Sequence, residues 1–501
     1  MPQPRPDLQD IVAIIDIGSN SGRVMVFKRD GSRHLRLLTG SRAPLRLVHD
    51  VDSRGELSEA TMARTTEALR DFKAIATGAG AKRIIAVATA AMRDASNGPL
   101  FAKRLQRELG TQIAIIGGLS EARFGFAGAV RGLAVNNGLL FDLGGGSMQL
   151  TRFERRRRGE AVSLPFGALR VSERFLESDP PSEKQLRRLR DYVRSRLAKA
   201  DVERLGSGER LVGTGGTLRN LARIDQHMRE YPIDALHGYE LSTDRLGRIV
   251  ERLSSLKQKR RDEVAGLSAE RADSIVGGAV VIHTLAEYVR ASRILVSGHG
   301  VREGIALDIL HLPVGSPDSV KEASLSSLVS RFGGWRPDAA ARRRELASAL
   351  QRALEPRAPA TVAAAIDHAA RVLDIGRTLD AVNRHKHAAD ILLSTDLEGF
   401  THGELALISS IVRRAGDRHA DVLTVARDGD ELDPGLVDRA AIIVALADEI
   451  EARCAGSKRI AITCTVGRSV TLSVRGLPSW LAKDLDKRFE RAFGRPLIVR
   501  H

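Results

Sequence analysis

The stretch FDLGGGSMQL, residues 141–150, ends an apolar run in an acid and three consecutive glycines. The run GLLFDL has the composition of a buried strand, and ordering three adjacent glycines costs conformational entropy. Backbone amides that follow a strand in such a loop form a concave site of positive potential, which attracts anions. The stretch therefore predicts an anion-binding loop, led by Asp142, at the end of a strand in an α/β protein.

The stretch DIGSNS, residues 16–21, repeats this arrangement about 126 positions earlier. Two more strands end in glycine loops, in GTGGT at 213–217 and in SGHG at 297–300. We expect a duplicated α/β domain whose two halves face a cleft, with the two Asp-led loops holding opposite sides of one phosphate group. The predicted phosphate-binding residues are Gly18, Ser19, Asn20, Ser21, Gly144, Gly145, Gly146, Ser147, Thr214, Gly215 and Gly216.

The two leading acids, Asp16 and Asp142, are candidate metal ligands. Carboxylates suit a hard divalent cation, and Mg²⁺ is commonly held through bound waters. We therefore expect Mg²⁺, with Mn²⁺ as the alternative. The other interpretation is that each aspartate caps its own turn.

The charge of the chain favours an anionic partner. The 501 residues carry a net charge of +16, yet residues 313–501 hold 28 Lys and Arg against 25 Asp and Glu, so most of the excess lies in the first 312 residues. Such a field attracts polyanions, although an Arg-decorated surface is an equally acceptable explanation. With four Tyr, two Trp and no nucleic-acid-binding module, we expect no specific nucleic-acid partner.

Several classes of protein are disfavoured. No apolar run reaches the roughly 18–20 residues that span a bilayer, so no membrane span is expected. The N-terminal MPQPRPDLQD lacks the apolar core of a secretion signal. Two cysteines, Cys454 and Cys464, do not make a disulfide framework. We expect a cytoplasmic protein.

The chain is long enough for roughly three or four domains of about 100–200 residues each. After Pro313 the pattern changes from strands and glycine loops to amphipathic helices, and after about residue 455 to a short hairpin and a closing helix. The predicted segments are a disordered lead-in at 1–10, α/β domains at 11–130 and 131–312, a helical domain at 313–430 and a small α+β domain at 431–501.

Nine motifs in the first 310 residues resemble the exopolyphosphatase and guanosine pentaphosphate phosphatase family (Ppx/GppA), in order and in character. They are DIGSNSGRV, ATAAMRDASN, IIGGLSEARFGFAGAV, DLGGGSMQL, SLPFGALR, GTGGTLRNLARI, LHGYELS, ERADSIVGGAVVI and SGHGVREGIALD. The resemblance implies duplicated actin-like (ASKHA, ribonuclease H-like) domains with a cleft between them. It also implies Mg²⁺-assisted hydrolysis of terminal phosphoanhydride bonds.

The resemblance assigns roles to three further residues. The family motif Ser-Gly-x-Glu-Glu-Ala reads Gly-Gly-Leu-Ser-Glu-Ala at 117–122, so one acid remains and Glu121 inherits the catalytic role. We expect Ser120 to be the N-cap of the helix that follows. Arg93 is the expected phosphate clamp, unless it pairs with Asp94. Gln149 stands where the family commonly has an acid, which leaves base catalysis to Glu121.

Other matches leave alternatives open. His237 and Arg271 lie in family motifs, and each either contacts substrate or braces the fold. The run Arg155–Arg158 is either a solvated hairpin turn or a guide for a polyphosphate chain.

The helical region resembles the HD-type phosphohydrolase scaffold. Its expected His-Asp pair reads Leu373-Asp374, and His385 and His387 lack that partner. We expect a degenerate domain without a metal centre of its own, which extends the polyanion channel and forms a homodimer.

The leading hypothesis is an exopolyphosphatase acting on inorganic polyphosphate. The alternatives are a pppGpp 5′-phosphohydrolase, with pppGpp or ppGpp as the partner, an actin-like ATPase or sugar kinase, and a non-catalytic polyphosphate or alarmone sensor.

Overall fold

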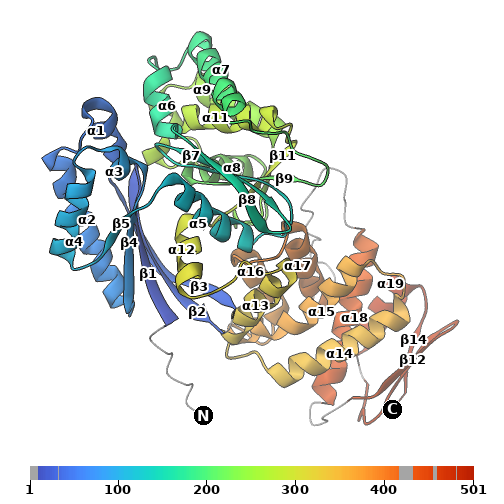
Figure 1. Cartoon of the computed structure of the whole chain (residues 1–501). Helices are drawn as coiled ribbons and strands as arrows, with labels where there is room; N and C mark the ends of the chain where they lie inside the picture. Colours follow the sequence, from blue (N-terminus) through green and yellow to red (C-terminus); the bar gives the residue numbers. More distant parts are fainter. Residues whose placement is uncertain (1–9, 32, 417–432, 455–459, 481, 501) are drawn as a thin grey trace. The chain divides into compact units, whose positions relative to one another are not determined.

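The structure, a computed structural model, describes residues 10–416, 433–454 and 460–500, except residues 32 and 481 (Figure 1). The predicted lead-in at 1–10 lies outside the described residues apart from Asp10. The described chain forms two compact units. One runs to Tyr231 and continues over Leu236–Ser324, and the other holds Pro232–Ala235 and the residues from Leu325 onward. The boundaries predicted for the individual domains stay predictions.

The first unit begins with a five-stranded sheet of order β3-β2-β1-β4-β5. Strand β1 pairs antiparallel with β2 and parallel with β4. We call this sheet and its helices lobe I. Its strands are β1 (Ile11–Ile17), β2 (Ser21–Asp30), β3 (His34–Pro44), β4 (Arg83–Ala88) and β5 (Ile113–Ile115). Its helices are α1 (Leu47–Arg54), α2 (Glu59–Gly78), α3 (Ala90–Asp94), α4 (Gly98–Leu109) and α5 (Gly118–Arg131).

A six-stranded sheet of order β10-β11-β9-β6-β7-β8 follows, and with its helices we call it lobe II. Its strands are β6 (Gly138–Leu143), β7 (Met148–Glu154), β8 (Arg157–Leu164), β9 (Arg210–Thr214), β10 (Glu240–Ser242) and β11 (Arg293–Val296). Its helices are α6 (Ala168–Phe175), α7 (Glu183–Lys199), α8 (Gly216–Met228), α9 (Thr243–Ser255), α10 (Gln258–Arg261), the 3-10 turn Ala269–Arg271, α11 (Ile275–Tyr288) and α12 (Val301–Ile309).

The two sheets share one topology, which confirms the predicted duplication. In each, an antiparallel three-stranded meander, β1-β2-β3 or β6-β7-β8, is followed by a strand that pairs parallel with its first member and by another that pairs parallel with that strand. The second sheet differs by the added strand β10, which pairs antiparallel with β11. The fold is the expected pair of actin-like domains.

The last helix of each lobe packs against the sheet of the other lobe. Apolar residues of α12 cluster with Val12 and Ile14 of β1, whereas residues of α5 cluster with Leu140 and Val212 of the second sheet. The two helices also touch each other. A Cβ at Gly128 would lie 2.0 Å from the Gly300 oxygen, and one at Gly304 would lie 1.8 Å from the Phe124 oxygen. Glycine at both positions is what allows this close approach.

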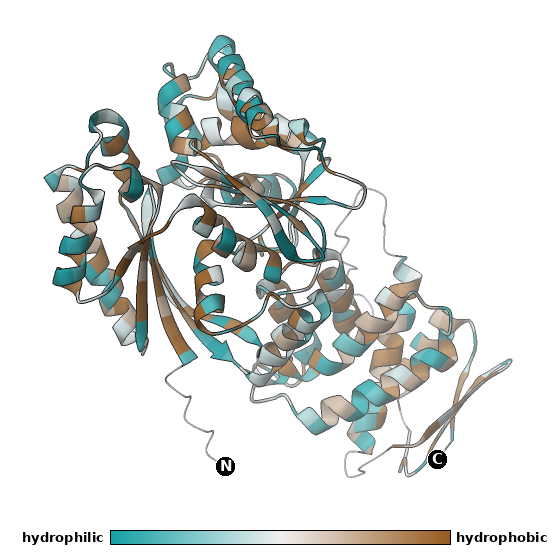
Figure 2. Ribbon diagram, viewed as in Figure 1, coloured by the Kyte–Doolittle hydropathy of each residue, from teal (hydrophilic) through white to brown (hydrophobic). Residues whose placement is uncertain are grey.

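Polar and apolar residues do not alternate along strand β1, because helices cover both of its faces. Ala13 and Ile15 pack with α2 and α4, while Val12 and Ile14 face α12. Because strand side chains alternate between faces, a strand covered on both sides is apolar throughout. Figure 2 shows the apolar strands beneath helices whose outward faces are hydrophilic.

The second unit carries the helices predicted for the C-terminal half. They are α14 (Pro337–Leu354), α15 (Ala360–Val372), the 3-10 turn Leu373–Thr378, α16 (Arg384–Ser394), α17 (His402–Gly416) and α18 (Pro434–Arg453), and α13 (Pro317–Ser330) leads into them. The predicted hairpin is confirmed as β12 (Ile462–Val466) and β13 (Val470–Val474), followed by α19 (Lys483–Phe493) and β14 (Leu497–Arg500). Cys454 and Cys464 are free thiols. Among the described residues, no helix has both the length and the apolar character needed to cross a bilayer.

One predicted helix start is wrong. Helix α5 begins at Gly118 with Gly117 as its N-cap, and the amide of Ser120 donates to the Gly117 oxygen at 3.0 Å. Ser120 therefore lies inside the first turn. Glycine is an acceptable N-cap, so the Gly117-Gly118 pair competes with serine for the helix start.

The residues of the run Arg155–Arg158 differ in burial and in their contacts. The hairpin prediction is confirmed, and the two turn residues Arg155 and Arg156 both have positive φ, as in type I′ turns. Arg155 is exposed, but Arg156 is buried. The Arg156 guanidinium donates to five carbonyls at the end of α5 and in the linker, those of Val130, Arg131, Leu133, Val135 and Gly315, at 2.7–2.9 Å.

We predict that Arg156→Met destabilises the first unit by about 3 kcal/mol or more, because several buried carbonyls lose their donor. Arg155→Met is the matched control, since it has the same backbone conformation but an exposed side chain, and should change stability by about 0.5 kcal/mol or less. Urea unfolding followed by fluorescence or circular dichroism measures both. Equal midpoints for the two variants would show that Arg156 is not a structural clamp.

Candidate active site

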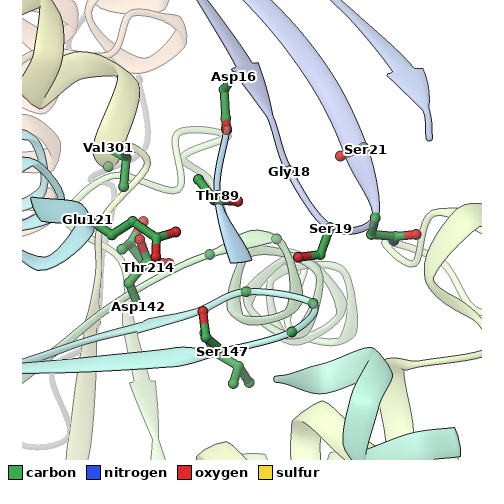
Figure 3. A pocket seen from close by; sticks show the side chains of 18 of the residues that line it. Asp16, Gly18, Ser19, Ser21, Thr89, Glu121, Asp142, Ser147, Thr214 and Val301 are labelled. Carbon is green, nitrogen blue, oxygen red and sulfur yellow. The ribbon is translucent and has the colours of Figure 1, made fainter. Parts of the chain in front are cut away.

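The predicted residues come together in one cleft of the first unit, between lobe I and lobe II (Figure 3). All predicted phosphate-binding residues line it, as do Asp16, Asp142, Glu121 and Gln149. Residues that line it beyond the predicted set are Arg23, Thr89, Leu143, Arg219, Arg271, Gly300, Val301 and Arg302.

The two Asp-led loops make the same turn. The amide of Gly18 donates to the Ser21 oxygen at 3.2 Å, and the amide of Gly144 donates to the Ser147 oxygen at 2.9 Å. Figure 3 shows Ser19 and Ser147 on the two loops, which enter the cleft from opposite lobes.

A short segment of each lobe binds the carbonyls of its own loop. In lobe I the amides of Leu45 and Arg46 donate to the Asn20 oxygen, and that of Val48 donates to the Ser19 oxygen. In lobe II the amide of Ala168 donates to the Gly144 oxygen, and those of Leu169 and Arg170 donate to the Gly145 oxygen. In a trans peptide the C=O and the following N–H point in opposite directions. Holding these carbonyls back therefore turns the amides of Asn20, Gly145 and Gly146 toward the cleft, where they can bind an anion.

The close approach of the loops explains two of the three glycines, Gly145 and Gly146. A Cβ at Gly146 would lie 3.1 Å from Ser19 Oγ, and a Cβ at Gly145 would lie 3.5 Å from the Cβ of Asn20. Behind the loop, a Cβ at Gly167 would lie 2.4 Å from the Gly145 carbonyl carbon. Side chains at these positions would push the two loops apart or fill the space between their amides.

The carboxylates of the cleft are destabilised in their charged form. Burial raises the pKa of Asp142 to about 6, with Arg219 opposing the rise and Asp16 adding to it. Burial also raises the pKa of Asp16, against the charges of Arg302 and Arg23. Neither carboxylate accepts a hydrogen bond from a residue that the structure describes. Both are thus available to a cation or to water.

Glu121 lies in the first turn of α5 and is buried. Burial raises its pKa to about 7, while the Arg93 guanidinium lowers it and the charges of Asp142 and Asp16 raise it further. Arg93 donates to Glu121 Oε2 at 3.3 Å and to the Ile116 oxygen at 2.9 Å. A carboxyl with a pKa near neutrality is suited to accept a proton at physiological pH.

Gln149 lies beside this carboxylate. It faces Asp142 across the β6–β7 pair, so the two side chains share one face of the sheet. Its Nε2 lies 3.0 Å from Ser147 Oγ, 3.3 Å from Ser163 Oγ and 3.4 Å from Glu121 Oε2. The amide therefore holds Glu121 and the second loop together without adding a charge.

Arg93 does not line the cleft, although it was expected to clamp phosphate. Besides Glu121 it lies near Asp94, with Nε 3.7 Å from Oδ1, so the salt-bridge alternative is present as well. The structure places Arg93 behind the cleft, in contact with Glu121.

Three arginines of the cleft, Arg23, Arg219 and Arg302, were missed by the sequence analysis. Burial lowers the pKa of Arg23 to about 8, and the charges of Arg219 and Arg302 lower it further. Burial likewise lowers the pKa of Arg219, with Arg302 adding to the effect. Guanidinium groups gathered in this way repel one another, and an anion between them relieves that repulsion.

The internal repeat was the signal that could have found Arg219. Arg93 follows Thr89 by four residues, and Arg219 follows Gly215 by four. Arg93 donates to the Ile116 oxygen just beyond β5, and Arg219 donates to the Gly298 oxygen just beyond β11, at 2.7 Å. The two arginines are therefore equivalent in the two lobes, but only Arg219 lines the cleft.

Arg271 and His237, for which the sequence left two roles open, lie at different distances from the cleft. Arg271 lines the cleft, where burial lowers its pKa to about 10. His237 is buried and does not line the cleft, and its ring stacks on that of His299 at 4.4 Å. Arg271 thus reaches the cleft, whereas His237 packs on the loop before Gly300. The arginine turn lies at the other end of β7 from Ser147, about 20 Å away along a seven-residue strand.

The family profile of the Ppx/GppA phosphatases matches residues 25–312. The chain belongs to the Ppx/GppA phosphatase family. Among curated relatives, exopolyphosphatase 2 of Mycobacterium tuberculosis is 32% identical over 320 residues, which are 60% of this chain and 98% of that protein. Exopolyphosphatase 1 of the same organism is 28% identical over 331 residues, 65% of this chain and 96% of that protein.

Solved structures of the family show the same fold. The Ppx/GppA protein of Aquifex aeolicus is 26% identical, with a TM-score of 0.53 over 60% of this chain and 98% of that chain. An exopolyphosphatase of Cytophaga hutchinsonii has 24% identity and a TM-score of 0.56, over 61% of this chain and all of that chain. Both matches leave about two fifths of this chain uncovered.

We predict that Glu121→Gln stabilises the protein at pH 8 but not at pH 5. The folded pKa of about 7 lies above the unfolded value of about 4.3, so the wild type loses stability as pH rises through that window. Removing the charge should raise the midpoint of thermal unfolding by roughly 2–5 °C at pH 8. The measurement uses EDTA to remove cations, with the exposed Glu59→Gln as control. A pH-independent difference would contradict the raised pKa.

Proposed function

We propose that the protein is an exopolyphosphatase that releases orthophosphate from the end of inorganic polyphosphate. One observation carries the proposal: two amide-lined loops, a carboxyl with a pKa of about 7 and a cluster of arginines line a single cleft. The loops are suited to a terminal phosphate and the arginines to the charges that follow it. The names of the mycobacterial relatives agree with this substrate.

In the proposed reaction Glu121 orients a water molecule and accepts its proton as the water oxygen attacks the terminal phosphorus. The bond from phosphorus to the bridging oxygen then breaks, and the shortened chain leaves with the electron pair. Charge on the transferred group is stabilised by the loop amides and by Arg219, which takes the clamping role expected of Arg93. Arg93 instead positions the base.

Mg²⁺ is the cation we propose for this reaction, with Mn²⁺ as the alternative. Asp16 and Asp142 would hold it, since both have raised pKa values that a cation would reverse. In the part of the chain that the structure describes, Asp16, Asp142 and Glu121 do not bring three ligand atoms within 4.8 Å of one another. That spacing suits a cation held partly through water. Bound there, Mg²⁺ would neutralise charge on the phosphates.

The character of the cleft favours polyphosphate over pppGpp. Its described lining contains Arg23, Arg219, Arg271 and Arg302 but no aromatic side chain. A phosphate chain needs only donors and positive charge, which these arginines supply, whereas the lining offers a guanine base no aromatic ring on which to stack. Hydrolysis of pppGpp remains the second candidate, favoured by the family to which the chain belongs.

The helical domain is proposed to be a degenerate HD-like domain without a metal centre. Its buried Asp374 is held by three arginines, with Arg343, Arg377 and Arg384 at 2.5–2.8 Å. Burial alone would raise the pKa of Asp374, but the charge and hydrogen bond of Arg343 lower it to about 2. A carboxylate shared among three guanidinium groups is poorly placed to bind a cation. Homodimer formation, a longer polyanion channel and the cytoplasmic location stay predictions.

We predict phosphate release from long-chain polyphosphate in the presence of Mg²⁺, with slower release from pppGpp and none from ATP. Glu121→Gln should lower kcat by about 10²-fold or more and leave KM nearly unchanged, because it removes the base and not the binding groups. Phosphate release from each substrate tests this, with the exposed Glu59→Gln as control. Binding of polyphosphate without any release would favour the sensor hypothesis, and ATP-dependent transfer to an alcohol would favour the kinase.

We predict that Gln149→Glu changes metal dependence and not binding. A second carboxylate beside Glu121 and opposite Asp142 attracts a cation and raises the pKa of Glu121. The Mg²⁺ concentration for half-maximal rate should fall several-fold, and the pH profile should move to higher pH. The exposed Gln106→Glu is the control for added charge. Unchanged metal and pH dependence would make position 149 purely structural.

A further inference from the structure

Arg170 of α6 connects the two lobes on the side where the phosphate loops meet. Its guanidinium contacts Asp52 of α1, with Nε at 3.1 and 3.2 Å from the two oxygens and Nη2 at 3.0 Å from Oδ1. It also contacts Asp94 of α3, at 3.2 Å. Both acids belong to lobe I, whereas Arg170 belongs to lobe II. We call Arg170, Asp52 and Asp94 the interlobe cluster.

The interlobe cluster is bonded to both parts of the active site. On one side, Arg170 Nη1 donates to the Gly146 oxygen at 3.2 Å, and the Arg170 amide donates to the Gly145 oxygen. On the other side, Asp94 lies 3.7 Å from Arg93, which in turn contacts Glu121. One guanidinium thus joins the second phosphate loop to the general base.

Lobe I sends a similar arginine in the opposite direction. The amide of Arg46 donates to the Asn20 oxygen of the first loop, and its guanidinium lies 3.6 Å from Asp273 of lobe II. In each lobe, then, an arginine binds its own phosphate loop through the main chain and an acid of the other lobe through its side chain. Arg42–Glu270 and His49–Glu173 add further contacts between the lobes.

These contacts lie away from the α5–α12 packing, which also joins the lobes. The backbones of α5 and α12 approach closely at Gly128 and Gly304, so this packing can act as a hinge. The ionic contacts are partly exposed, with Arg170 20% and Asp52 27% accessible. A single exposed ion pair contributes little, but a network anchored to a loop carbonyl can hold a defined geometry.

We propose that Arg170 is a positioning residue that holds the two lobes closed and keeps the Gly144–Gly146 loop in register with Arg93 and Glu121. The inference rests on the proposed function for its catalytic consequence, but the closure itself is independent of it. When the interlobe cluster is broken, the lobes separate at the loops, and Glu121 loses its alignment with the terminal phosphate. Polyphosphate still binds in the cleft, because Arg23 and Arg271 lie outside the interlobe cluster.

The first test uses Asp52→Asn, which is outside the cleft, and Arg170→Gln, separately and together. We expect Asp52→Asn to lower kcat for short-chain polyphosphate about tenfold and Arg170→Gln to lower it more, with KM changed less than about twofold for each. The double variant should lose no more than Arg170→Gln alone, because Asp52 acts through Arg170. Arg170→Lys should recover part of the rate. Arg104→Gln, which breaks the exposed ion pair with Glu59 inside lobe I, is the matched control and should leave kcat unchanged.

The second test measures the separation of the lobes directly. Spin labels at Lys103→Cys of α4 and Arg187→Cys of α7, with Cys454→Ala and Cys464→Ser, report the distance between the lobes. We expect Asp52→Asn to lengthen or broaden the distance distribution and the Arg104→Gln control to leave it unchanged.

The outcomes separate this inference from the proposed function. An unchanged distance distribution in Asp52→Asn, or additive losses of kcat in the double variant, would overturn the positioning role. A lower unfolding temperature with normal kcat would also overturn it, because the cluster would then be structural only. Absence of phosphate release by the wild type from any substrate would overturn the proposed function, while the distance measurement would still test closure.

Discussion

The active site depends on where the loop carbonyls go. In both lobes the amides after the third strand bind the carbonyls of the Asp-led loop, as Leu169 and Arg170 do for Gly145. Each bond fixes one peptide plane, and the amide on the other side of that plane is left facing the cleft. An anion-binding site then exists before any anion arrives, so binding does not incur the cost of reorganising the loop.

This constraint explains why glycines stand in the stretch 144–146. The amides of the second loop can reach a shared phosphate only if the first loop lies within van der Waals distance, and Gly145 and Gly146 leave that distance open toward Asn20 and Ser19. None of the three glycines has a positive φ. Gly145 and Gly146 are therefore explained by space rather than by backbone conformation, whereas a Cβ at Gly144 would approach only the Ser147 oxygen of its own loop, at 3.3 Å.

The fold and much of the site could be predicted because local sequence patterns indicate them. Apolar strands ending in Asp and glycine, repeated about 126 positions apart, specified both the duplication and the facing loops. The arginines were harder, because the direction of a side chain such as Arg219 depends on packing that no local pattern encodes. Arg156 was also not predictable from local sequence. Four consecutive arginines look equivalent, yet one of them lies under the end of α5 and donates to five carbonyls. The N-cap of α5 was misplaced because a glycine and a serine both suit that role.

The duplication also explains why Glu121 lines the cleft and its counterpart Glu303 does not. Each of the helices α5 and α12 has a glutamate in its first turn, but Glu121 is four residues after the N-cap Gly117, whereas Glu303 is three residues after the N-cap Gly300. Glu303 Oε2 accepts the Gly300 amide at 2.6 Å, so this acid caps its own helix. Glu121 contacts Arg93 and Gln149 instead, and its pKa rises. The arginines divide in the complementary way: Arg93 contacts Glu121, whereas Arg219 lines the cleft. Two copies of one unit thus supply acidic and basic side chains to the same cleft.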